Sequence, residues 1–227
     1  MSADHQKRAA GEAAAQLVET GMTVGLGTGS TAAFFVKALA ARRLAVRGVA
    51  TSKATAVLAR RLGIEIVDLD DAGAIDLTVD GADEIGPGLD LIKGAGAALL
   101  REKLVWEASA KCVVVADASK RVERLGRSPL PIEVVAFGHV TTAARIAGAL
   151  KACGVDAPPL LRLDGGRPVV TDSGNLIYDA ACGAIEAPAD LARVLKGLTG
   201  VVEHGLFLGL AGRALIAADH GMIDLGS

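Results

Sequence analysis

The chain has 227 residues, of which 51% are hydrophobic and 22% charged, and its formal net charge at pH 7 is −2. This apolar fraction excludes a disordered or low-complexity protein, and the length fits one large domain or a domain with a smaller partner. The near-neutral charge and the aromatic content of 3% exclude the basic or aromatic-rich surfaces that usually bind nucleic acid. Any anion must therefore be bound by a local site.

Short apolar runs alternate with helical patterns through the first half of the chain. Strands are expected at 22–27, 44–50, 64–69, 74–83 and 112–117. Helices are expected at 5–19, 30–41, 52–61 (with Ser52 as its N-cap) and 96–108. Such alternation implies parallel strands joined by right-handed crossovers. The sequence therefore predicts an α/β fold with a doubly wound, mostly parallel sheet and helices on both faces.

The pattern changes at residues 127–131, where two prolines bracket one leucine and indicate a domain boundary. Beyond it, strands are expected at 132–138 and 158–164, helices at 141–154 and 189–200, and a hairpin turn at 172–175. This mixture is typical of a small α+β unit. The apolar stretch 205–219 is expected to return to the sheet of the large domain. The predicted domains are 1–127 together with 204–227, and 128–203.

The three cysteines, Cys112, Cys153 and Cys182, are widely spaced and form no Cys-x-x-Cys pair. Neither a disulfide framework nor a zinc ribbon is therefore expected, and Cys112 is expected to be a small buried residue. Residues 1–21 lack the apolar core of a signal peptide, and no apolar run approaches the roughly 20 residues of a membrane span. The sequence predicts a cytoplasmic protein with no membrane partner.

The strongest local signal is the segment 24–31, VGLGTGST, where a strand runs into a helix through glycines and hydroxyl-bearing residues. Glycine lets backbone N–H groups face an anion, and a helix N-terminus adds partial positive charge. The surrounding segment 20–64 carries no Asp or Glu but several Lys and Arg residues. These features favour a phosphate-containing ligand. The alternative is an ordinary glycine-rich turn with Ser30 as its cap.

Two familiar nucleotide-binding motifs do not fit this segment. The dinucleotide fingerprint G-x-G-x-x-G has Ser30 in place of its last glycine, and no acidic residue precedes Glu65 to bind a ribose hydroxyl. The Walker motif requires Gly-Lys-Ser/Thr, which is absent. A nicotinamide-dependent dehydrogenase therefore ranks low.

An acidic turn, VDGADEI at 79–85, follows another predicted strand. Because ligands of open α/β sheets bind at the carboxyl ends of strands, Asp80 and Asp83 are expected to aim both carboxylates into one crevice. The alternatives are a solvated turn and a divalent-metal site. The turn lacks the regularly spaced oxygen ligands of an EF-hand calcium loop. The histidines of the sequence have no neighbours at the spacing of zinc ligands.

The segment 91–103 places Lys93 before two glycines and a helix start, where its ammonium group is expected to reach an anion near backbone donors. Glu102 lies on the helix that follows. Taken alone, it indicates a solvated side chain paired with Arg101 or Lys103. The combination of phosphate loop, acidic turn, lysine and glutamate on one parallel sheet favours a functional role instead.

Together these segments resemble, in chain order, the motifs of the ribose-5-phosphate isomerase A family. The motifs are GLGTGSTAAFFVKAL, TVDGADEI, IKGAGAALLREKLV, VVVADASK, PLPIEVV, PVVTDSGNLI and GVVEHGLF, and the resemblance covers residues 7–208. It implies a Rossmann-like large domain, a smaller α+β domain, and interconversion of D-ribose 5-phosphate and D-ribulose 5-phosphate in the pentose phosphate pathway. It also implies no metal, no cofactor, and a homodimer or homotetramer.

The resemblance also assigns roles to the residues that match the motifs. Glu102 is the expected proton acceptor, and Asp80, Asp83 and Lys93 are the other expected catalytic residues. The expected substrate-binding residues are Lys7, Thr28, Gly29, Ser30, Thr31, Asp80, Gly81, Ala82, Asp83, Lys93, Gly94, Ala95, Gly96 and Lys120. At Ala95 some family members have glycine, and the extra methyl group is expected to be tolerated.

The implied reaction moves a proton between C2 and C1 through a cis-enediolate, after the furanose ring opens. Asp80 and Asp83 are expected to act at the ring oxygen and anomeric hydroxyl. Glu102 is expected to remove the C–H proton, and Lys93 with the neighbouring amides to stabilise the developing oxyanion. Phosphate bound at 28–31 is expected to position the reacting carbons.

Three other functions remain open alternatives. Deamination of an amino-sugar phosphate and hydrolysis of a phosphogluconolactone are enzymatic ones, and a sugar-phosphate sensor without turnover is a non-enzymatic one. The acidic turn, Lys93, Glu102 and the ADASK segment together fit the isomerase pattern better. A sensor is also disfavoured because no DNA-binding segment is appended.

Overall fold

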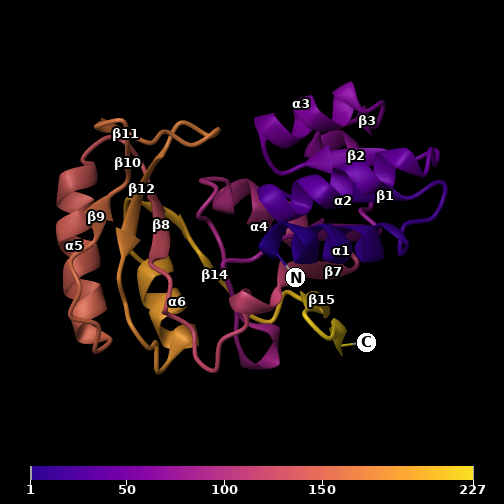
Figure 1. Cartoon of the computed structure of the whole chain (residues 1–227). Helices are drawn as coiled ribbons and strands as arrows, with labels where there is room; N and C mark the ends of the chain where they lie inside the picture. The colour runs from indigo at the N-terminus through magenta and orange to yellow at the C-terminus, as the bar shows by residue number, and fades with distance from the viewer. Residues whose placement is uncertain (1, 227) are drawn as a thin grey trace. The chain divides into compact units, whose positions relative to one another are not determined.

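The computed structural model describes residues 2–226 and divides the chain into two compact units (Figure 1). The first unit consists of Met1–Ala82, Arg101–Lys120 and Gly209–Ser227, and the second of Asp83–Leu100 and Arg121–Leu208. The segments 83–100, 121–127 and 204–208 therefore group with the second unit, although the sequence analysis assigned them to the large domain.

The first unit contains a seven-stranded sheet with the strand order β16-β15-β7-β4-β1-β2-β3. All neighbouring strands are parallel except β15 and β16, which are antiparallel. The strands are β1 (Thr23–Leu26), β2 (Arg47–Ala50), β3 (Glu65–Ile66), β4 (Leu77–Asp80), β7 (Cys112–Asp117), β15 (Arg213–Ala218) and β16 (Gly221–Gly226). The predicted strands exist but are mostly shorter than expected, and β16 was not predicted.

Helices cover both faces of this sheet, as predicted for the fold class. They are α1 (Ala3–Ala15), α2 (Ser30–Ala41), α3 (Lys53–Arg61) and α4 (Leu99–Glu107). On one face, Ala10 of α1 and Phe35 of α2 pack against alternate strand residues such as Leu26, and Figure 1 shows these two helices side by side. On the other face, Val105 of α4 packs with Val49 of β2. The first unit also contains the 3-10 helices Leu69–Asp71 and Ala118–Lys120.

Several helix boundaries differ from the prediction by a few residues, and two of the differences have a clear physical reason. The first helix ends at Ala15 instead of residue 19, and the guanidinium group of Arg42 donates to the carbonyls of Ala15 and Val18, which satisfies acceptors at that end. Helix α4 starts at Leu99 instead of residue 96, because Gly94 and Ala97 have φ values of 115° and 57°, outside the helical region.

The second unit is α+β, as predicted for the smaller part of the chain. Its four-stranded antiparallel sheet has the order β13 (Val201–His204), β8 (Leu130–Val134), β12 (Leu176–Ala180) and β9 (Leu160–Leu161). Helices α5 (His139–Ala152) and α6 (Pro188–Lys196), both labelled in Figure 1, pack on one face of it. There Ile146 and Leu191 belong to the same apolar cluster as Ile132 and Tyr178. The expected turn at 172–175 is present and is closed by a bridge between Val170 and Leu176.

Two small sheets complete the second unit. One is a hairpin of β10 (Leu163–Asp164) and β11 (Arg167–Pro168). The other is three-stranded, with the order β14 (Leu206–Phe207), β6 (Leu91–Ile92) and β5 (Glu84–Ile85), and the 3-10 helix Pro87–Leu89 lies between β5 and β6 in the chain. None of the helices within residues 2–226 combines the length and apolar character that a membrane span needs.

Candidate active site

The predicted phosphate loop lies where the strand order of the first unit reverses. Strand β1 pairs with β2 on one side and with β4 on the other. Ligands of open α/β sheets bind at such a switch point, outside the carboxyl ends of the strands. Gly27 and Thr28 directly follow β1, and Gly81 directly follows β4. The topology therefore brings two of the predicted segments to one place.

Asp80 ties these two strand ends together. Its Oδ1 accepts a hydrogen bond from Thr28 N at 3.0 Å and another from Gly81 N at 2.7 Å. The side chain is fully buried, and the backbone of Gly27 also donates to the carbonyl of Val79 at 3.0 Å. Backbone N–H donors stabilise a buried carboxylate. Asp80 therefore fixes the loop after β1 against the loop after β4.

Gly27 is required by the close approach of these loops. A β-carbon at this position would lie 2.2 Å from Asp80 Oδ1 and 2.6 Å from the Cα of Asp80. No side chain fits at such distances, and moving backbone is costly. The glycine in the motif thus has a steric role that is independent of any ligand.

Hydroxyl groups that follow β2, from Thr51 and from Thr55 in the first turn of α3, hold the loop on its other side. Thr28 Oγ1 lies 2.7 Å from Thr51 Oγ1 and 3.4 Å from Thr55 Oγ1. Thr55 Oγ1 donates to the carbonyl of Gly27, and Thr51 Oγ1 donates to that of Leu26. The sequence analysis missed Thr51 and Thr55 as supports, although the run of hydroxyl residues after a predicted strand was a usable signal.

The N-terminus of α2 is suited to an anion. Its N-cap is Gly29, with a φ of 104°, which has no side-chain cap, and its first turn contains no acidic residue. The alternative with Ser30 as the cap is wrong, because Ser30 is the first helical residue. Ser30 is exposed and Thr31 is buried, and a β-carbon on Gly81 would lie 3.9 Å from Thr31 Cβ. Uncapped N–H groups and the helix dipole both favour a bound negative charge.

Lys120 and Lys7 lie on other elements of the same unit. Lys120 ends the 3-10 helix that follows β7, the neighbour of β4 in the sheet. That turn is fixed by Asp117, whose Oδ1 accepts from Ser119 N at 3.0 Å. Lys7 lies on α1 with its Nζ 3.9 Å from Asp4 Oδ1. Lys120 is therefore placed at a strand end next to the loop after β4.

Glu102 is buried, with 3% of its surface exposed. It lies in the first turn of α4, and Lys103 beside it is also buried, at 7% exposure. The alternative of a solvated surface glutamate is therefore wrong. A carboxylate withdrawn from water is rare in proteins and is usually kept for a specific interaction or reaction.

In the second unit, the turn Lys93–Gly96 is compact and close-packed. Lys93 is buried at 2% exposure, its backbone N donates to the carbonyl of Gly205, and its Nζ lies 5.5 Å from the ring centroid of Phe207. Gly94 has a φ of 115° and is buried, whereas Ala95 and Gly96 are exposed. The turn therefore exposes backbone groups next to a buried cationic side chain.

Asp83 binds this turn. Its Oδ2 accepts a hydrogen bond from Ala95 N at 2.9 Å, and its own backbone N donates to the carbonyl of Ile92 at 2.8 Å. Asp80 and Asp83 therefore bind different backbone segments, although they are three positions apart. The methyl group of Ala95 does not prevent its N–H from reaching the carboxylate.

Two residues that the sequence analysis did not consider, Arg162 and Asp179, also support this turn. Arg162 Nη1 donates to the carbonyls of Gly94 and Ala95, and the rest of its guanidinium group binds Asp179. Arg162 follows Gly94 by 68 positions, so neither motif nor spacing indicated the contact.

Burial changes the acidity of two thiols. It raises the pKa of Cys112 from 9.0 to about 11, and the negative charge of Asp80 adds to the increase. It also raises the pKa of Cys182 to about 11, where a hydrogen bond involving the backbone of Leu130 opposes the increase. Both side chains are free thiols, and Cys112 is buried as predicted.

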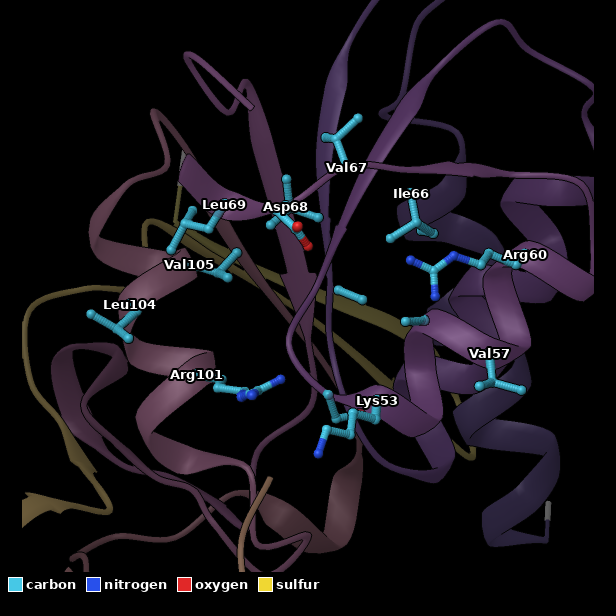
Figure 2. A pocket seen from close by; sticks show the side chains of 14 residues that line it. Lys53, Val57, Arg60, Ile66, Val67, Asp68, Leu69, Arg101, Leu104 and Val105 are labelled. Carbon is cyan, nitrogen blue, oxygen red and sulfur yellow. The ribbon is translucent and has the colours of Figure 1, made fainter. Parts of the chain in front are cut away.

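A separate cavity of about 490 Å³ lies beside α3 in the first unit. Figure 2 shows Lys53, Arg60 and Arg101 around it, together with Asp68 and apolar side chains. None of the predicted site residues lines this cavity. Among residues 2–226, no group of three or more His, Cys, Asp or Glu side chains is arranged to hold a metal ion.

Comparisons with known proteins agree with this geometry. The model of the protein family described as ribose 5-phosphate isomerase A (phosphoriboisomerase A) matches residues 47–221. The ribose-5-phosphate isomerase A of Caulobacter sp. (strain K31) is 65% identical over 225 residues, which are 99% of each chain. That of Roseiflexus castenholzii is 52% identical, covering 98% of this chain and 96% of the other.

Solved structures show the same likeness over the whole chain. The ribose 5-phosphate isomerase of Plasmodium falciparum superposes with a TM-score of 0.93 at 33% identity, over 99% of both chains. A D-ribose-5-phosphate isomerase in complex with phospho-erythronic acid superposes with a TM-score of 0.92 at 35% identity, over 100% of both chains. The chain therefore belongs to the ribose-5-phosphate isomerase A family, and it is an isomerase that interconverts ribose 5-phosphate and ribulose 5-phosphate.

Proposed function

We propose that the loop Gly27–Thr31 binds the phosphate group of the pentose and that Glu102 transfers the proton between its C1 and C2 atoms. The observation that carries this proposal is the N-terminus of α2, which has no side-chain cap and no acid in its first turn. A phosphate dianion bound there accepts from backbone N–H groups and from the hydroxyls of Ser30 and Thr31. Lys120 supplies a countercharge at the neighbouring strand end.

The proton transfer needs a base that keeps the proton it takes. Glu102 removes the proton from C2 of the open-chain aldose, and the electron pair of the C–H bond forms the C1–C2 double bond of a cis-enediolate. The same carboxyl group returns the proton to C1, while the hydroxyl proton of O2 moves to O1, so that O2 becomes the carbonyl oxygen of the ketose. Burial of Glu102 supports this role, because a shielded carboxyl exchanges its proton with solvent less readily.

The remaining proposed groups prepare the substrate and stabilise charge. We assign ring opening to Asp80 and Asp83 and stabilisation of the enediolate oxygen to Lys93. Burial of Lys93 at 2% exposure supports this assignment, because the interaction of an ammonium group with a developing oxyanion is stronger out of water. Gly29, Gly81, Ala82 and Gly94–Gly96 provide backbone contacts, and Lys7 is assigned to substrate binding by its position in the family motif.

The ligand of one relative supports the same chemistry. Phospho-erythronic acid, which that isomerase binds, combines a phosphate monoester with a planar carboxylate. A carboxylate has two oxygens in one plane with shared negative charge, as the enediolate does. A site that binds such an acid is therefore matched to a planar anionic intermediate.

The proposed route is tested by running the reaction in heavy water. Purified protein converts ribose 5-phosphate to ribulose 5-phosphate, and NMR measures deuterium at C1 of the product. We expect ketose formation with deuterium at C1 in a fraction of the molecules, since one carboxyl group carries the proton and partly exchanges it. Because a shielded carboxyl exchanges slowly, the reaction is followed to equilibrium over many turnovers. Ketose that still contains no deuterium would indicate a direct hydride shift between the carbons and would contradict the enediolate.

Three coarser properties complete the proposal. We expect a homodimer or homotetramer, and sedimentation measures this oligomeric state. We expect no nucleic-acid or membrane partner. We expect activity to persist in EDTA, since no step above uses a metal. The protein is assigned to the cytoplasm because its doubly charged substrate does not cross a lipid bilayer.

We also propose that the first compact unit carries the phosphate loop and Glu102 as the catalytic domain, with the second as the smaller domain.

A further inference from the structure

The guanidinium group of Arg162 lies at the centre of a hydrogen-bonded network in the second unit. Its Nε and Nη2 donate to the two carboxylate oxygens of Asp179 at 2.7 and 2.5 Å. Its Nη1 donates to the carbonyl of Gly94 at 2.9 Å and to that of Ala95 at 3.1 Å. One planar side chain therefore joins a carboxylate to two consecutive peptide groups.

This side chain is anchored before it reaches the turn. The backbone N of Arg162 donates to the carbonyl of Ile177 in β12, and its carbonyl accepts from Val169 N. The side chains of Arg162 and Asp179 are only 17% and 26% exposed. A bidentate pair that is mostly withdrawn from water holds its geometry better than a surface ion pair does. Asp179 thus fixes the plane of the guanidinium group.

The turn that Arg162 contacts includes backbone conformations that are unfavourable by themselves. Gly94 and Ala97 both have positive φ, and Ala97 carries a β-carbon that disfavours this conformation. Within the turn, Ala97 N donates to the carbonyl of Gly94 at 3.1 Å. Such strained conformations persist only where surrounding groups hold them.

Binding the two carbonyls sets the direction of two N–H groups. In a trans peptide the N–H points opposite to the C=O of the same plane. The carbonyl of Gly94 shares its plane with Ala95 N, and the carbonyl of Ala95 shares its plane with Gly96 N. Both N–H groups therefore point away from Arg162. Ala95 N–H meets Asp83 Oδ2 at 2.9 Å, and Gly96 is exposed.

We propose that Arg162, held by Asp179, is a positioning residue for the isomerase reaction. It orients the two peptide planes so that Ala95 N–H fixes the carboxylate of Asp83 and Gly96 N–H is presented to the anionic intermediate. This inference rests on the proposed role of Asp83 and the turn Lys93–Gly96 in binding substrate. Arg162 itself touches no reacting atom.

The test compares Arg162→Ala and Arg162→Lys with Arg213→Ala as the matched control. Arg213 forms an equally bidentate pair with Asp224, at 2.8 and 2.5 Å, between β15 and β16 of the other unit. The Lys variant keeps the charge but offers one point donor in place of a planar fork. We measure kcat, KM, the unfolding midpoint, and the hydrogen-exchange rates of the amides of Ala95 and Gly96 by NMR.

For both Arg162 variants we expect kcat to fall about 10- to 100-fold with a much smaller change in KM, as expected for misplaced groups near the reaction. The Ala95 amide is expected to exchange at least about tenfold faster, because its bond to Asp83 is no longer held. Added guanidinium ion is expected to restore part of the kcat of Arg162→Ala. It is expected to leave the kcat of Arg162→Lys unchanged. The Arg213→Ala variant is expected to keep wild-type kcat and Ala95 exchange.

Unchanged kcat and unchanged Ala95 exchange in folded Arg162→Lys would overturn the inference, and that variant decides the question if Arg162→Ala does not fold. Faster Ala95 exchange with unchanged kcat would also overturn it, because the turn would then be loosened without effect on the reaction. Wild-type protein that fails to isomerise ribose 5-phosphate would contradict the proposed function, whereas the exchange rates would still report whether Arg162 orients the turn.

Discussion

The loop Gly27–Thr31 and the turn Lys93–Gly96 are both built to present backbone N–H groups, but they are held in different ways. The loop is fixed by short side chains at neighbouring strand ends, namely Asp80, Thr51 and Thr55. The turn is fixed by the long side chain of Arg162, which reaches it from a distant segment. Sheet topology suffices to form the first, whereas the second depends on contacts with segments distant in sequence, among them Arg162 and Gly205.

This difference predicts how each region tolerates change. In the loop, supports are packed against backbone, so an added atom has no room. In the turn, the supports are the ends of flexible side chains, so an added atom displaces side chains first. The changes below test this contrast, from the largest expected effect to the smallest.

Gly27→Ala is expected to have the largest effect. Its new β-carbon would overlap Asp80, at 2.2 Å from Oδ1 and 2.6 Å from Cα. We expect the free energy of unfolding to fall by about 3 kcal/mol or more and activity to be lost, because the Thr28–Asp80 contact must break. Denaturant unfolding measures the change. Gly148→Ala is the control, since a β-carbon there meets nothing within 4 Å and the helix favours alanine. A Gly27→Ala protein as stable as this control would contradict the packing argument.

Gly94→Ala is expected to have a smaller effect on stability. The nearest atoms to its new β-carbon all belong to side chains: Leu99 Cδ2 at 2.8 Å, and Leu99 Cβ and Pro131 Cγ at 3.1 Å. The φ of 115° adds a conformational cost of about 1–3 kcal/mol. We expect a loss of that size in the free energy of unfolding, below that of Gly27→Ala in the same denaturant series. The reverse order would show that the turn, and not the loop, is the more tightly packed region.

Thr28→Val tests the hydroxyl support without changing the shape of the side chain. The hydroxyl group lies 2.7 Å from Thr51 Oγ1, so its loss leaves a polar partner in a partly buried position. We expect about 1–2 kcal/mol of destabilisation and a higher KM, with a smaller change in kcat. Thr28→Ser keeps the hydroxyl group and is expected to retain the wild-type KM. A raised KM in Thr28→Ser together with a wild-type KM in Thr28→Val would mean that the methyl group, not the hydroxyl, supports the loop.

The smallest effect concerns stability at alkaline pH, and it involves the buried thiol of Cys112 and the partly buried thiol of Cys182. Because the folded pKa of Cys112 and of Cys182 is raised to about 11, these thiols stay protonated while the unfolded chain loses its protons near pH 9. Their contribution to stability is therefore complete below pH 9 and is lost between about pH 9 and 11. Unfolding midpoints across this range should fall less steeply in the Cys112→Ala and Cys182→Ala double variant. An unchanged slope would show that other groups cause the alkaline loss.

Much of the first region was predictable from the sequence. Alternating strands and helices imply a parallel sheet, and Gly27 to Thr31 and Asp80 follow two of its strands, so their meeting at the carboxyl edge follows from topology. The burial of Glu102 was not predictable from its neighbours Arg101 and Lys103, which suggested a solvated position. The contact of Arg162 with the turn depends on pairing between β9 and β12, which local patterns do not determine.

Domain limits were the least predictable feature. Prolines at 129 and 131 indicated a boundary, yet residues 83–100 also belong to the second unit. The strands β5 and β6 are only two residues long and pair with each other, and β6 also pairs with β14. Such short strands carry no periodic signal, so their grouping is set by contacts distant in sequence.

The transfer of a proton by Glu102 is the central claim, and it is tested most directly by Glu102→Gln against Glu107→Gln. Both residues lie on α4, but Glu107 is exposed. We expect Glu102→Gln to bind ribose 5-phosphate with nearly wild-type affinity, to lose kcat by about 10²–10⁴-fold, and to stop exchanging the C2 proton of the aldose with heavy water. The Glu107 variant should match the wild type in all three. Turnover and C2 exchange near wild-type rates in Glu102→Gln would contradict the account.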